Sequence, residues 1–113
     1  MKTRTEYLYA GQKMADAIEA LAVGEEEVRT RLISALNCLA PLRVEQLPPD
    51  LQKEYAAIFK ACTKSGPVKD QAGRVTVGSI QRTLGACRKK TAAALAQRLF
   101  DLYFDLMRKM NSE

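Results

Sequence analysis

The chain has 113 residues, of which 47% are apolar and 27% charged, and its formal net charge is +5. This length predicts a single helical domain over residues 1–113 with a core of its own. The charged fraction is too low for a disordered chain, and no run of about eighteen apolar residues could span a bilayer.

The chemistry that the sequence lacks narrows the function. There is no histidine, which removes the usual general base, Ser-His-Asp and Cys-His catalysis, and most zinc sites. Glycine motifs that bind phosphates or dinucleotides are also absent. We therefore expect a protein that is not an enzyme and that has no cofactor and no metal. Cys38, Cys62 and Cys87 lie at apolar helical positions, which predicts free thiols in a reducing, cytoplasmic compartment.

The composition predicts an all-α fold. Leu and Ala dominate, aromatic residues are few, and runs of β-branched residues are nearly missing, as in helical bundles. Only residues 75–77 could be briefly extended, so a sheet is not expected. We expect a four-helix bundle with a long C-terminal helix.

The first helix is expected to begin at a capping box formed by Thr3 and Glu6 and to run to about Val23. Gly24 would end it in a left-handed conformation. The three glutamates at 25–27 follow at once. They would lie in the first turn of a second helix, where the helix dipole favours negative charge.

In that second helix, Glu25 could pair with Arg29, and Glu27 with Arg31, each four residues further on. The helix should end before Pro41. A short connection over residues 42–47 leads to a third helix.

The third helix is expected to begin at Pro48-Pro49, since proline is tolerated in the first turn. The Lys-Ser-Gly-Pro sequence at 64–67 would stop it. Residues 68–75 form the main loop, with a turn at 70–73.

The last third, residues 76–110, carries one apolar stripe at helical spacing, with Thr76 as the expected N-cap. The stripe consists of Ile80, Leu84, Cys87, Thr91, Ala94, Leu95, Leu99, Leu102, Leu106 and Met110. Two interpretations are open: two helices separated near Gly85, or one continuous helix ~50 Å long. Because the stripe keeps its register across Gly85, we favour the continuous helix, whose ends would need cover from stacked helices or a second subunit.

Residues 99–107 are more apolar than a surface helix requires. Either the helix is central in a monomeric bundle, or it lies at an interface. The leading functional hypothesis is therefore a protein-interaction or self-associating module, dimeric by preference because symmetric dimers are common. The predicted oligomer interface consists of Phe100, Tyr103, Phe104 and Met107.

Positive charge is concentrated in residues 64–90, where seven cationic side chains face Asp70 alone, a net charge of +6. The cationic side chains are Lys64, Lys69, Arg74, Arg82, Arg88, Lys89 and Lys90. Such a patch is a solvated surface, a nucleic-acid site or a site for an acidic protein. No aromatic residue for base stacking is interleaved with it.

Residues 79–95, Ser-Ile-Gln-Arg-Thr-Leu-Gly-Ala-Cys-Arg-Lys-Lys-Thr-Ala-Ala-Ala-Leu, resemble a helix-turn-helix. Leu84-Gly85 would open the turn, and Arg88 to Lys90 would begin the recognition helix. Gln81 departs from the motif, which usually has a small residue there, and the second helix is mostly Ala and Leu. The resemblance implies a nucleic-acid-binding regulator, and it is incompatible with a continuous helix.

Overall fold

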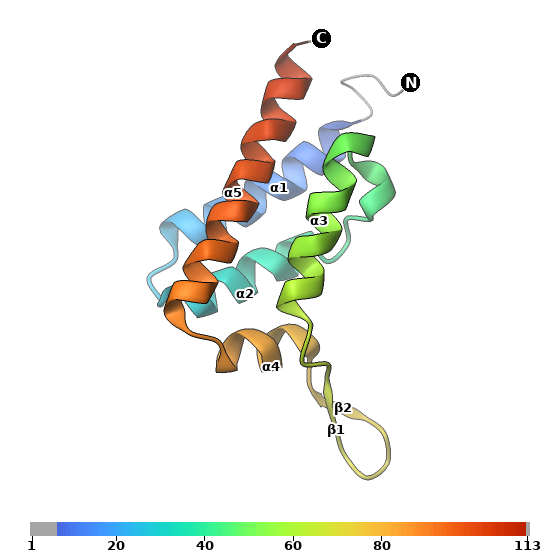
Figure 1. The fold of residues 1–113 in the computed structure, drawn as a ribbon, viewed down its shortest axis with the longest axis vertical. Helices are drawn as coiled ribbons and strands as arrows, with labels where there is room; N and C mark the ends of the chain where they lie inside the picture. The colour runs from blue at the N-terminus through green and yellow to red at the C-terminus, as the bar shows by residue number, and fades with distance from the viewer. Residues whose placement is uncertain (1–6, 113) are drawn as a thin grey trace.

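The computed structural model describes residues 7–112, without the side chains of residues 76 and 77. Figure 1 shows the helices α1 (Leu8–Val23), α2 (Val28–Leu39), α3 (Pro49–Cys62), α4 (Ser79–Ala86) and α5 (Lys89–Asn111), a 3₁₀ turn η2 (Val44–Gln46), and a hairpin of β1 (Val68–Lys69) and β2 (Val75–Val77). The predicted all-α class is confirmed. No helix in the described part of the chain is long and apolar enough to cross a membrane.

Helix α5 organises the packing, because it contacts α1, α2 and α3. Helices α1 and α2 pack on each other, and α4 packs across the ends of α2 and α3. The hairpin projects beyond α4, away from the C-terminal end of α5 (Figure 1). The molecule therefore has a packed body and a thinner end built from the hairpin, α4 and the start of α5.

The core is made of aliphatic side chains from all five helices of the described chain. Helix α5 contributes an inward stripe of Ala92, Leu95, Leu99, Leu102, Leu106 and Met110. Gly11 lets α1 approach this stripe, because a Cβ there would lie 3.2 Å from Met107 Cε and from Met110 Sδ. The predicted burial of Thr91 and Ala94 is wrong, since both are exposed.

The expected left-handed end of the first helix is also wrong. Gly24 has φ −66° and ψ 141°, which is extended backbone. A Cβ at Gly24 would lie 2.8 Å from Arg31 Cγ and 2.9 Å from the Ala20 carbonyl oxygen. This position therefore needs glycine for close approach rather than for positive φ. Thr3 and Glu6, the expected capping box, lie outside the described residues.

The acidic run lies one turn earlier than predicted. Helix α2 begins at Val28, and Glu27 is its N-cap, whose carboxylate accepts a hydrogen bond from the Arg29 backbone N–H. Arg29 pairs with Glu27 rather than Glu25. Arg31 donates to the carbonyl oxygens of Leu21 and Glu26, so the two predicted pairs four residues apart are wrong.

Helix α3 begins and ends close to the predicted residues. Its buried Tyr55 hydroxyl lies 3.3 Å from the Leu39 carbonyl oxygen and 3.2 Å from that of Leu42. Burial raises the pKa of Tyr55 to about 12. The hydroxyl therefore stays protonated as a donor and ties α3 to the end of α2.

The segment after α3 forms an antiparallel hairpin where only a loop was expected. Val68 pairs with Val77, and Lys69 pairs with Val75. The predicted turn at 70–73 is confirmed: the Gly73 N–H donates to the Asp70 carbonyl oxygen, with Gly73 at φ +82°. The expected N-cap at Thr76 is wrong, because Thr76 belongs to β2 and Gly78 caps α4.

The last third contains two helices, so the favoured continuous helix is wrong. Helix α4 ends at Ala86, and α5 starts at Lys89. Between them, Cys87 (φ −81°, ψ 163°) and Arg88 (φ −73°, ψ 150°) are extended. Gly85 itself remains helical, two residues before the break. This is the alternative that a helix-turn-helix requires.

Candidate nucleic-acid interface

The turn between α4 and α5 is held from a distant part of the chain. Arg29 Nη1 donates to the Cys87 carbonyl oxygen at 3.1 Å. The guanidinium is fixed in turn by Glu27, with Nε–Oε1 at 2.7 Å and Nη2–Oε2 at 2.9 Å. Lys89 Nζ lies 3.6 Å from Glu27 Oε2. One carboxylate therefore starts α2, orients Arg29 and neutralises part of the first turn of α5.

Hydrogen bonding from Arg29 lowers the pKa of the Glu27 carboxyl from 4.5 to about 2, although partial desolvation opposes the shift. The carboxylate is consequently ionised across the physiological pH range. The turn is fixed by charge as well as by packing.

The structure gathers the predicted cationic side chains at the thin end of the molecule. They belong to the segment after α3, the hairpin, α4 and the start of α5, which lie at one end of the molecule (Figure 1). All seven residues are exposed. We call this set (Lys64, Lys69, Arg74, Arg82, Arg88, Lys89 and Lys90) the basic end. Arg82 and Lys89 belong to different helices, α4 and α5.

Most of these charges are unneutralised. Arg74 pairs with Asp70 at 3.1 Å and Lys89 with Glu27. The other five residues of the basic end form no ion pair within residues 7–112. Like charges brought together at one end raise the local positive potential, which attracts a polyanion.

The start of α5 strengthens this potential. Arg88 is its N-cap and gives no side-chain hydrogen bond, and the first turn holds no acidic residue. A helix N-terminus has unsatisfied backbone N–H groups and a partial positive charge, which favour negative side chains or bound anions. Here Lys89 and Lys90 add charge of the unfavourable sign.

A part-buried hydrogen bond ties α4 to the segment that leads into the hairpin. Thr83, 4% exposed, accepts a hydrogen bond through Oγ1 from the Ser65 backbone N–H at 3.1 Å. Asp70 accepts hydrogen bonds from the Ala72 and Arg74 backbone N–H groups, which closes the tip. These hydrogen bonds fix the segments that carry the cations of the hairpin and Arg82 of α4.

The residues of the predicted oligomer interface differ in their exposure. Phe100 is 45% exposed and Phe104 53% exposed. Their ring centroids lie 6.4 Å apart, and the Arg108 guanidinium lies 5.5 Å from the Phe104 ring. Tyr103 and Met107 instead pack half-buried against the core on the α1 side. Of these four residues, only Phe100 and Phe104 are exposed.

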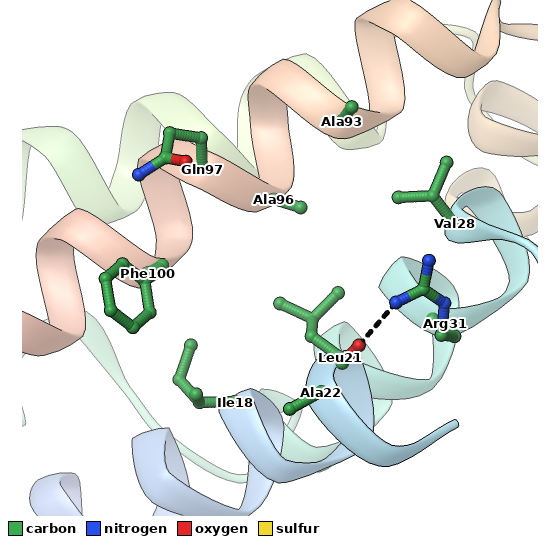
Figure 2. A pocket seen from close by; sticks show the side chains of 9 residues that line it. All are labelled: Ile18, Leu21, Ala22, Val28, Arg31, Ala93, Ala96, Gln97 and Phe100. Atoms are coloured by element: carbon green, nitrogen blue, oxygen red, sulfur yellow. Dashed lines mark hydrogen bonds between the residues drawn. The ribbon is translucent and has the colours of Figure 1, made fainter. Parts of the chain in front are cut away.

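An apolar groove lies next to Phe100, between α1 and the first half of α5 (Figure 2). Its volume is about 310 Å³, and its walls include Ile18, Leu21, Val28, Ala93 and Ala96. In Figure 2 the side chains from α1 and α2 point across the gap toward the alanines of α5. The small alanines leave the space that larger side chains would fill.

The described residues include three free thiols. Burial raises the pKa of Cys62 to about 11, so that thiol stays protonated. Cys38, Cys62 and Cys87 are all free. Within residues 7–112, no group of three potential metal ligands comes together.

Comparison with known proteins adds no relatives: no protein-family model matches the chain, and no curated protein and no solved structure is significantly similar to it. The fold defines the class, an all-α protein.

Sequence reasoning missed the residues that build this end. Arg29 holds the turn from 58 positions away, and no local pattern marks such a contact. Two signals were present for the hairpin: valines on both sides of the 70–73 turn, and a glycine at its last position.

Proposed function

We propose that this protein binds double-stranded DNA through the basic end, as a non-enzymatic regulator. The observation that carries the proposal is the uncapped start of α5. Lys89 and Lys90 follow the two-residue turn of Cys87 and Arg88 there, and α4 and the hairpin lie at the same end of the molecule. Recognition helices of helix-turn-helix proteins contact DNA with their N-terminal residues. The free thiols favour a reducing, cytoplasmic location.

Duplex DNA is favoured over other polyanions for two reasons. No aromatic residue occurs between Phe59 and Phe100, so the basic end lacks the stacking platform of a single-strand binder. The major groove of DNA admits a helix, whereas the deep, narrow major groove of duplex RNA does not. Exposed Ala93 and Ala94 supply small apolar contacts and no base hydrogen bonds, so we expect weak sequence preference.

The test is fluorescence anisotropy of a labelled mixed-sequence DNA duplex, titrated with the full chain at several salt concentrations. About four to six phosphate contacts would give a slope of log K against log salt near −4 to −5. Duplex RNA and polyglutamate serve as competitors. Absence of binding at low salt, or equal competition by polyglutamate, would refute DNA as the partner.

The variant for this test is Lys90→Glu, since Lys90 is exposed and unpaired within the described residues. Its matched control is Lys53→Glu, the same charge change at an exposed position of α3 in the body. We expect Lys90→Glu to weaken binding to every sequence and to reduce the salt slope by about one or more. Lys89 is a poorer choice because reversing it would also break its pair with Glu27.

A further inference from the structure

We infer that a second copy of this chain docks on the exposed face of α5, antiparallel to it, around a two-fold axis at Phe104. This contact is separate from the basic end and does not depend on DNA binding. Phe100 and Phe104 are each about half exposed, next to an apolar groove. Contiguous exposed apolar surface of this kind marks interaction sites on soluble proteins.

The order of the exposed residues on this face indicates that the partner is a second copy of the chain. Gln97, Asp101, Phe104, Arg108 and Asn111 are all exposed and follow one another at steps of four, three, four and three residues, so they form one stripe along the helix. Phe104 is its midpoint, with Gln97 and Asn111 seven residues to either side. Phe100 and Arg108 are each four residues away. Reversal about Phe104 therefore sets Gln97 opposite Asn111 and Phe100 opposite Arg108.

Charge selects the antiparallel arrangement. With the axis at Phe104, Asp101 of one chain lies beside Arg108 of the other, and Arg108 also lies over the opposing Phe100. An arginine over an aromatic ring is favourable, and Arg108 already takes that position on its own Phe104. A parallel pair would bring Asp101 to Asp101 and Arg108 to Arg108. The helix dipoles also favour opposite directions.

The groove extends this contact. In the antiparallel pair the partner's last turn of α5 lies over residues 97–100, which border the groove beside Ala93 and Ala96. An isologous interface uses one self-complementary patch on both subunits, and this patch holds both projecting rings and a hollow. Because a single helix supplies most of it, we expect a reversible dimer at the small end of interface sizes.

Sedimentation equilibrium of the full chain, without nucleic acid, tests the dimer. The expected mass rises with concentration from 12.6 kDa toward twice that value. Phe104→Asp should abolish the rise, and since Phe104 is half exposed, circular dichroism should show an unchanged fold. A mass that stays at 12.6 kDa at every concentration, or a Phe104→Asp variant that dimerises like the wild type, would overturn the inference.

A charge exchange tests the antiparallel register. Asp101→Arg and Arg108→Asp should each weaken the dimer by about tenfold or less, because exposed pairs contribute little. The double variant carrying both changes should recover the wild-type affinity. Failure of the double variant to recover would exclude this arrangement.

Discussion

The cationic side chains at the two ends of α5 differ in whether they have acidic partners. From Arg98 onward, cations reach carboxylates on α3: Arg98 Nη2 lies 2.7 Å from Glu54 Oε1, and Lys109 Nζ lies 2.7 Å from Asp50 Oδ2. At its N-terminal end, Arg88 and Lys90 have no acidic partner among the described residues. The same helix therefore carries charges used for packing at one end and charges free for a partner at the other.

The difference shows why a count of basic residues is a poor guide to function. The carboxyl pKa of Glu54 is lowered by the hydrogen bond from Arg98, and that of Asp50 by the one from Lys109. These half-exposed pairs join α5 to α3. Cations that lack such partners can contact phosphates without first breaking an ion pair.

The largest effect on the free energy of unfolding is expected at the start of α5. Ala92 is fully buried, and its neighbour Thr91 is exposed. Ala92→Leu should overpack the junction and lower the free energy of unfolding by about 1–3 kcal/mol. Thr91→Leu should change it by about 0.5 kcal/mol or less. Urea denaturation of both variants measures the difference in the free energy of unfolding. Equal effects would mean that Ala92 does not belong to the buried stripe of α5.

A smaller effect is expected at the base of the hairpin. Thr83→Val keeps the shape of the side chain but removes the acceptor for the Ser65 N–H, which should lower the free energy of unfolding by about 1 kcal/mol. We also expect faster amide exchange in the hairpin, measured by hydrogen–deuterium exchange, with α3 and the second half of α5 unchanged. Thr91→Val is the control. A uniform increase across the body would contradict a local anchor.

The smallest effect is expected from pH. The folded pKa of Glu27, about 2, lies below its ordinary value of 4.5, so its contribution to stability is complete above pH 4.5 and is lost as the pH falls toward 2. Glu27→Gln should therefore flatten the fall of the thermal midpoint in this window. Glu19→Gln, at an exposed site without a described ion pair, should leave it unchanged. If the thermal midpoints of all three proteins fell equally with pH, Glu27 would have no role in stabilising the turn between α4 and α5.

Much of the fold follows from local chemistry. Pro49 lies in the first turn of α3 as predicted, and Gly66 follows its end with φ +69°. The turn at 70–73 was predicted from its residue types. The cationic residues of the basic end were predicted as a group, and the structure gathers them. Of the predicted interface residues, Phe100 and Phe104 are exposed, whereas Tyr103 and Met107 are half-buried against the core. Helical periodicity does not show this difference, because it depends on how closely α1 approaches at Gly11.

The break in the last third shows what the sequence by itself does not determine. Leu84, Cys87 and Thr91 continue an apolar period, and Gly85 is tolerated within a helix, so local pattern favours continuity. The tertiary structure instead turns the chain at Cys87 and Arg88 and buries Leu84 from α4 and Ala92 from α5 in one core. Arg29 donates to the part-buried Cys87 carbonyl oxygen at the bend. The local sequence determined which segments form helices and turns. The turn between α4 and α5, which shapes the basic end, depends instead on the contact between Arg29 and Cys87, which are distant in the sequence.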